Sequence, residues 1–328
     1  MPLHLAARTH AFIHGLFRPG DLQVTQELFD RVEGLFRRHG LRSPEGREVL
    51  IEELTSDVLA RLDLPDDHPQ RAVVLRFIKR TFDYEGLFQF PEPRWEDRGS
   101  VSELWALRDE LNAQRQLLED LPQVRSLLID TFAEIVGRLH EACPALSADS
   151  EIENGIPAPA PLIRSIGDVG RLTESVCAAI CTDELAEAGL FTRHVARLER
   201  NLVAASGGNP AADPRTFQRT PKMPSKSDIG DPAELAATYL GGTPLLELFD
   251  QELPFTIPTE ARFEHHHIVA GSGHGKTQTL QYLIGHDLEA VARGERSVVV
   301  LDSQGDLTVP SPDWASSQGA GRLPTGLS

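Results

Sequence analysis

The sequence is poor in cysteine, in lysine and in long apolar runs, and each shortage excludes a class of protein. Three cysteines are an odd number, which argues against the disulfide framework of a small secreted domain. No stretch approaches the roughly 20 consecutive apolar residues that span a bilayer. The N-terminus lacks the basic-then-apolar layout of a secretory signal. We therefore expect a cytoplasmic protein.

Acidic residues outnumber basic ones, and the net charge of the chain is −17. This excess of acid provides no overall attraction to nucleic acid or to an anionic membrane, although a local basic groove remains compatible with it. The 328 residues suffice for two domains, and 40% hydrophobic with 25% charged residues is ordinary for a soluble globular protein.

Residues 1–205 predict an all-α domain. Pro44 directly after Ser43 is the pattern of a helix N-cap and first turn. Ser100–Glu103 is a capping box that opens another helix, and Pro122 ends it. Apolar residues repeat at helical spacing through the region, at Ile51, Leu54, Val58 and Leu62, at Leu104, Leu107, Leu111 and Leu118, at Leu128, Phe132, Ile135 and Leu139, and at Val169, Leu172, Val176 and Ile180.

This helical region offers no catalytic constellation. His10 and His14 have the spacing of some metal sites and His4 is nearby, but no acidic or cysteine partner accompanies them, which favours a solvated helix face. Cys177 and Cys181 lie one helical turn apart without further ligands, which favours buried thiols over a metal or redox pair.

A change in composition predicts the domain boundary. Residues 206–232 are rich in Gly, Pro, Ser and Lys and predict a mobile linker. Residues 233–307 form the predicted second domain, which starts with a short helix at Ala233–Leu240. Pro254–Pro258 is short, apolar and bounded by proline, as in an edge strand. Residues 308–328 have no periodicity and predict a disordered tail.

A glycine-rich stretch at the start of an amphipathic helix predicts a nucleotide site. The glycines allow positive φ and let backbone N–H groups converge on an anion, and the helix adds unpaired N–H groups and the positive end of its dipole. Lys276 is expected to reach the β- and γ-phosphates of ATP as the catalytic residue, and the Thr277 hydroxyl to join the shell of Mg²⁺. The predicted nucleotide-binding residues are Gly271, Ser272, Gly273, His274, Gly275, Lys276, Thr277 and Gln278.

The surroundings of this loop predict a strand–helix–strand unit. This is the structural context that the motif requires, which argues against a chance match. Phe263–Ala270 has the pattern of a strand before the loop, and Ser297–Leu301 that of a doubly buried parallel strand after the helix. Gly294 stands where a helix C-cap glycine is expected. His265–His267 would alternate between the faces of the first strand, so they do not converge on one metal ion. The helix is expected to present Leu280, Leu283, Ile284, Leu288 and Val291 on one face.

The run Arg262–Gly271, continued by Gly275–Gln278, resembles the P-loop region of the HerA/FtsK-like ATPases, a group that includes the coupling ATPases of type IV secretion. In that family the next strand ends in Asp-x-x-Gly followed by an acid, and Asp302–Asp306 has this form here. The resemblance covers residues 241–307. It implies an α/β P-loop domain of the RecA-like ASCE class, and a homo-oligomeric ring that binds ATP and Mg²⁺ and couples ATP hydrolysis to DNA movement.

Measured against that family, the ATPase domain is expected to be incomplete. Asp302 is a weak candidate for a magnesium ligand, because the family's Walker B strand comes later with an adjacent glutamate, whereas Ser303 follows here. The sequence contains no candidate for that glutamate or for an arginine finger. We therefore expect a multi-domain chain, all-α and then incomplete α/β, truncated after the second core strand or completed by a second polypeptide.

Three functional hypotheses follow from the sequence. The first is part of a HerA/FtsK-like DNA-translocating ATPase. The second is a P-loop ATPase that acts as a switch without a role on DNA, and DNA-stimulated hydrolysis would separate it from the first. The third is a helical interaction module with a vestigial nucleotide site, which would bind its partner independently of ATP.

Overall fold

The chain folds into two compact units in the computed structural model. The helical unit comprises the described residues before Asp149 and those of Ala160–Leu253. The second unit comprises the described residues of Ser150–Pro159 and Pro254–Ser328. The structure describes residues 19–91, 101–146, 155–158, 160–253, 256–258, 260–264, 268–269, 271, 273 and 275–300.

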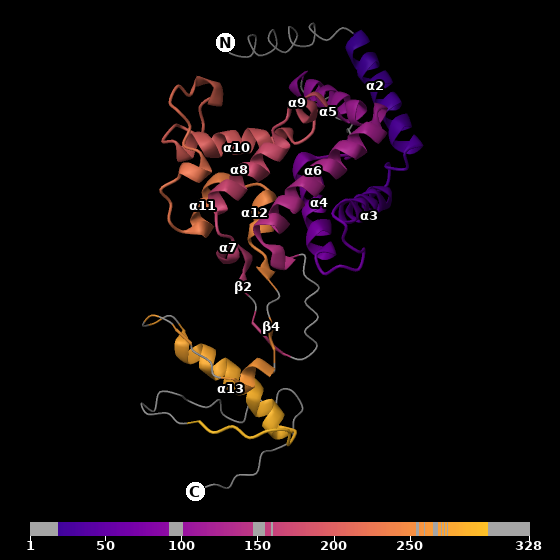
Figure 1. Cartoon of the computed structure of the whole chain (residues 1–328). Helices are drawn as coiled ribbons and strands as arrows, with labels where there is room; N and C mark the ends of the chain where they lie inside the picture. Colours follow the sequence, from indigo (N-terminus) through magenta and orange to yellow (C-terminus); the bar gives the residue numbers. More distant parts are fainter. Residues whose placement is uncertain are drawn as a thin grey trace, which may run out of the picture. The chain divides into compact units, whose positions relative to one another are not determined.

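Helices account for nearly all regular structure of the helical unit (Figure 1), as the sequence predicts. In the described part of the chain, no helix is long and apolar enough to cross a membrane. The α-helices are α2 (Pro19–Arg38), α3 (Pro44–Arg61), α4 (Arg71–Glu85), α5 (Val101–Glu119), α6 (Leu121–Ala142), α7 (Leu162–Ser165), α8 (Val169–Ile180), α9 (Asp183–Glu187), α10 (Thr192–Ala205), α11 (Pro232–Leu240) and α12 (Leu245–Phe249), and the 3-10 turns are η1 (Pro144–Leu146), η2 (Pro214–Thr216) and η3 (Pro224–Lys226).

One continuous apolar core joins these helices, and α6 lies at its centre because it packs against both α3 and α8. Phe132 of α6 meets Phe77 of α4 and Phe191 edge-on, with ring centroids 5.6 and 5.8 Å apart. All three rings are buried. Truncating a buried phenylalanine to alanine typically costs about 3–5 kcal/mol, so these few aromatic residues contribute heavily to the stability of the unit.

Local sequence signals set the helix starts. The Ser43 side chain accepts a hydrogen bond from the Gly46 N–H, and Pro44 occupies the first turn of α3, which confirms the predicted cap. Asp168 and Thr182 cap α8 and α9 in the same way. Each cap satisfies a backbone N–H that the helix itself leaves unpaired.

The segment 206–232, predicted to be a mobile linker, is packed against the helical unit. Ser225 of η3 donates to the Glu174 carboxylate of α8 through both its backbone N–H, at 2.9 Å, and its hydroxyl, at 2.6 Å. The Tyr239 hydroxyl donates to the Lys222 carbonyl at 2.8 Å. The boundary between the units therefore lies after Leu253 rather than within 206–232.

In the described part of the chain, four short strands form two antiparallel pairs. In the helical unit, β2 (Ala160–Pro161) pairs with β3 (Glu252–Leu253). In the second unit, β1 (Gly155–Pro157) pairs with β4 (Thr256–Pro258). The strand predicted at Pro254–Pro258 is thus confirmed at Thr256–Pro258, and its partner is Gly155–Pro157.

The second unit contains a 3-10 turn, η4 (Glu260–Phe263), and one long helix, α13 (Lys276–Ala292). The two core strands predicted on either side of α13 are absent where the structure describes them. Phe263 belongs to η4, and residues 297–300 carry no regular structure, with the Val299 side chain 83% exposed. A buried parallel strand needs backbone partners on both edges, and β1 and β4 of this unit pair with each other.

Candidate functional site

The predicted phosphate-binding loop leads into α13 through left-handed glycines. Gly273 has a φ of 78° and Gly275, the N-cap residue of α13, a φ of 74°. These conformations favour glycine, because a side chain at such φ values is strained. The helix then begins at Lys276, as the motif predicts.

The side chains that follow the glycines project from the first turn of α13. Lys276 and Gln278 are exposed, and Thr277 is half-buried. Thr279 closes the turn, since its backbone N–H and its hydroxyl both donate to the Gly275 carbonyl, at 2.9 and 3.1 Å.

This helix start leaves backbone donors for an anion. Gly275 provides no side-chain cap, so the N–H groups of the first helical turn are free of intrahelical partners and point along the positive end of the dipole. An added Cβ at Gly273 would meet no atom within 4 Å, so the approach to the loop is open on that side. The residues present therefore fit the phosphate end of a nucleotide.

Other parts of the predicted site lie outside the described residues. Ser272, His274 and Asp302 belong to this group, as do His265–His267. Thr277, the proposed magnesium ligand, is among the described residues, whereas Asp302 is not, so the structure gives no contact between the two. The predicted C-cap at Gly294 is confirmed, with a φ of 76°.

Among the described residues, no group of three or more His, Cys, Asp or Glu side chains is arranged to hold a metal ion. His4, His10 and His14 lie outside the described residues. Burial raises the pKa of the Cys177 thiol to about 12. Cys181, predicted to be buried, is exposed at the end of α8.

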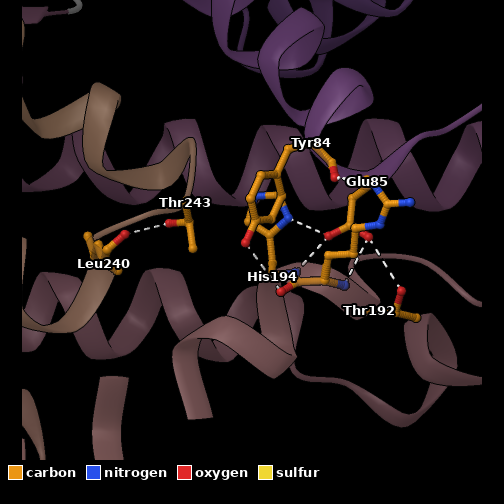
Figure 2. A network of polar contacts seen from close by, with 7 residues as sticks. Tyr84, Glu85, Thr192, His194, Leu240 and Thr243 are labelled. Atoms are coloured by element: carbon orange, nitrogen blue, oxygen red, sulfur yellow. Dashed lines mark hydrogen bonds and ion pairs between the residues drawn. The ribbon is translucent and has the colours of Figure 1, made fainter. Parts of the chain in front are cut away.

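A buried carboxylate–imidazole pair was missed by the sequence analysis. Glu85 is the last residue of α4 and His194 lies in the first turn of α10, with both side chains 1% exposed (Figure 2). The Glu85 Oε1 atom lies 2.6 Å from Nδ1 of His194. It also accepts the His194 backbone N–H at 2.7 Å, and Oε2 accepts the Arg193 N–H at 3.0 Å.

Hydrogen bonds keep this buried carboxylate ionised. Burial raises the pKa of Glu85, but the hydrogen bonds from the His194 ring and from the two backbone N–H groups outweigh burial, and the pKa lies below its usual value. Because a carboxylate only accepts, Nδ1 of His194 carries the proton. Nε2 of the same ring is buried and has no partner among the described residues.

The geometry assigns this pair a structural role. Phe191, the N-cap residue of α10, provides no side-chain cap, and the Glu85 carboxylate from α4 takes that place. The pair thereby fastens the end of one helix to the start of another. Neither of two pockets in the described part of the helical unit is lined by Glu85 or His194.

Comparisons with known proteins identify no relative. No protein-family model, no curated protein and no solved structure matches the chain. The assignment of a function therefore depends on the residues of the chain and their arrangement.

Proposed function

We propose that this chain binds Mg-ATP through Gly271–Gln278 and serves in a HerA/FtsK-like ATPase that moves DNA. The observation that carries the proposal is the helix start at Lys276, directly after two glycines in left-handed conformation, Gly273 and Gly275. The residue order and this backbone geometry are both those required for a loop that surrounds phosphate.

Backbone groups of the helix start and two side chains of the loop each have a part in this binding. The backbone N–H groups of the first turn of α13 would donate to phosphate oxygens, and the exposed Lys276 ammonium would add charge at the β- and γ-phosphates. The Thr277 hydroxyl would hold Mg²⁺, which neutralises phosphate charge when bound. Gln278, also exposed, lies at the edge of the same turn.

The part of the proposal that concerns DNA rests on the resemblance alone. The run Arg262–Gly271 and the motif Asp302–Asp306 carry that resemblance. A homo-oligomeric ring, ATP hydrolysis and coupling to DNA movement are the properties that the resemblance brings.

Titration of the full chain with ATP in the presence of Mg²⁺ tests the nucleotide site. Lys276→Ala removes charge-assisted hydrogen bonds worth roughly 1.5–3 kcal/mol, so ATP affinity should fall about ten- to hundredfold. Lys226→Ala is the matched control, since Lys226 is exposed on η3 in the helical unit, and it should bind as the unaltered chain does. Equal ATP affinities for the two variants would refute the proposal.

A helical interaction module is the second candidate, favoured by the continuous core that the helical unit has on its own. In that case the chain would bind a partner protein with equal affinity whether or not Mg-ATP is present. Such binding, combined with absence of measurable ATP binding, would replace the ATPase proposal.

A further inference from the structure

Three arginines gather on one face of α10 in the helical unit. Arg193, Arg197 and Arg200 are spaced by four and three residues, which places them on the same side of a helix, and all three are exposed. Burial and the charge of Glu85 raise the pKa of the Tyr84 hydroxyl of α4, and the charges of these three arginines oppose that rise. We call these three residues the α10 arginine face.

Backbone contacts hold two of these guanidinium groups in position. Arg193 donates from Nη1 to the Tyr84 carbonyl at 2.9 Å, and Arg197 donates from Nε to the Gly241 carbonyl at 3.0 Å. Glycines make room for both. A Cβ at Gly86 would lie 3.2 Å from Nη2 of Arg193, and one at Gly242 would lie 2.8 Å from Nε of Arg197.

These charges also lack the acidic partners that many other arginines of the unit have. Among the described residues, no carboxylate lies within ion-pair distance of the α10 arginine face. The fold brings Glu85 close to α10, but its carboxylate is buried and already accepts hydrogen bonds from the His194 ring and from two backbone N–H groups. By contrast, other arginines of the unit pair with carboxylates, as do Arg31, Arg47, Arg61, Arg71, Arg125, Arg138 and Arg164.

Glu199 precedes Arg200 in the sequence, but among the described residues no ion pair joins it to the α10 arginine face. Burial and the charge of Glu199 both raise the pKa of the Cys181 thiol at the end of α8. In a chain of net charge −17, three neighbouring arginines on one helix face without ion pairs form a local positive surface, which suits an anionic ligand.

We propose that the α10 arginine face binds the phosphodiester backbone of a nucleic acid. Guanidinium groups match phosphate geometry and stay charged at every physiological pH. The row extends over about 10 Å along the helix, since seven residues rise by 1.5 Å each, and therefore meets successive charges of a linear polyanion rather than one phosphate. The face lies in the helical unit, and the proposal does not depend on the nucleotide site of the second unit.

Salt-dependent binding of a fluorescein-labelled oligothymidine to the full chain, without ATP, tests the proposal. Three phosphate contacts to a single strand predict a slope of about −2 in a plot of log affinity against log salt concentration. Arg200→Gln, which disturbs no described hydrogen bond, should weaken binding about three- to tenfold and reduce the slope by about 0.7. The triple variant Arg193→Gln, Arg197→Gln, Arg200→Gln should abolish the salt-dependent binding.

Two controls separate this result from other causes. Arg138→Gln removes an exposed arginine that pairs with acids on α6 and should leave DNA binding unchanged. Lys276→Ala should also leave it unchanged, so a failed nucleotide site does not affect this test. Arg200→Gln binding as tightly as the unaltered chain would overturn the proposal. So would equal displacement of the DNA by poly-glutamate and by unlabelled oligothymidine, a result that would indicate an acidic protein partner instead.

Discussion

Glu85 shows how a single residue can determine the junction of two helices. Its buried carboxylate accepts hydrogen bonds from the His194 ring and from two backbone N–H groups. A buried donor left without a partner would lower the stability of the fold. These hydrogen bonds join the end of α4 to the start of α10. Because Arg193 belongs to the α10 arginine face, they also hold the backbone at the start of that face.

Glu85→Gln should destabilise the chain by about 1.5–3 kcal/mol at neutral pH. The neutral amide replaces a charged acceptor, and its NH2 group would face N–H donors that the carboxylate accepts. The matched control is Glu134→Gln, which removes an exposed carboxylate paired with Arg138 and should change stability by less than about 0.5 kcal/mol. Urea unfolding followed by far-UV circular dichroism measures both. Equal effects of the two substitutions would contradict the assigned role.

The pH dependence of this effect has a definite sign. The pKa of Glu85 is lower in the folded chain than in the unfolded chain, so its contribution is present above the unfolded pKa of about 4.3 and is lost as pH falls through the folded value. The stability difference between the unaltered chain and Glu85→Gln should therefore be smaller in acid than at neutral pH. A difference that persists undiminished in acid would argue against an ionised carboxylate.

Sequence could identify some of these residues but not others. The Ser43 cap was predictable, because a serine before proline acts on a backbone N–H three residues away. The Glu85–His194 pair joins residues 109 positions apart, and no local pattern marks either one. The α10 arginines were visible as charge, but their lack of acidic partners depends on the tertiary fold.

At the scale of elements, α13 is defined by a glycine at each end. Gly275 precedes it and Gly294 follows it, both with positive φ. The Gly294 N–H donates to the Val291 carbonyl and the Glu295 N–H to the Ala290 carbonyl, the two bonds of a Schellman motif. The helix boundaries therefore follow from local backbone chemistry, and the sequence predicted both.

Two glycine substitutions in or beside α13 should have opposite effects. Gly294→Ala forces a side chain into a left-handed conformation and should destabilise the helix by about 1 kcal/mol. Gly285→Ala, inside the helix with no atom within 4 Å of the added Cβ, should stabilise it by about 0.5–1 kcal/mol. Amide hydrogen exchange of α13 peptides measures both changes. The same sign for both would show that α13 does not end as described.

Strands were harder to predict than this helix. Val298–Val300 has the composition of a buried strand, yet a strand also requires a neighbouring backbone, which composition does not report. The pairing of β1 with β4 joins segments far apart in the sequence, and the bounding prolines of Pro254–Pro258 indicated an extended chain without indicating its partner. The fold class was therefore predictable for the helical unit, whereas the α/β part stays a prediction.

At the scale of the whole molecule, the extent of the helical unit differs from the predicted domain boundary. Residues 206–232 have the composition of a linker, but their few apolar groups and short polar contacts are enough to attach them to α8 and α11. Composition measures the average character of a segment, whereas attachment depends on individual contacts such as that of Ser225 with Glu174.

Gly170→Ala tests this attachment. The added Cβ would lie 2.8 Å from the Pro224 carbonyl oxygen and 2.9 Å from Cα of Ser225, so η3 should be displaced at a cost of about 1–3 kcal/mol. Tryptic cleavage after Lys222 or Lys226 should then be faster. Gly34→Ala in α2, where the Cβ would meet no atom within 4 Å, is the control. Unchanged cleavage in Gly170→Ala would contradict a packed 206–232 segment.

Amide hydrogen exchange with and without Mg-ATP tests the central proposal most directly. At a saturating Mg-ATP concentration, peptides covering Gly271–Thr279 should exchange about tenfold or more slowly, because the first-turn N–H groups of α13 would be bonded to phosphate. Peptides of α10 should be unaffected, and Lys276→Ala should need an Mg-ATP concentration about ten- to hundredfold higher for the same protection. Protection by Mg-ATP confined to another segment, or unchanged exchange at this loop while ATP is bound, would contradict a nucleotide site here.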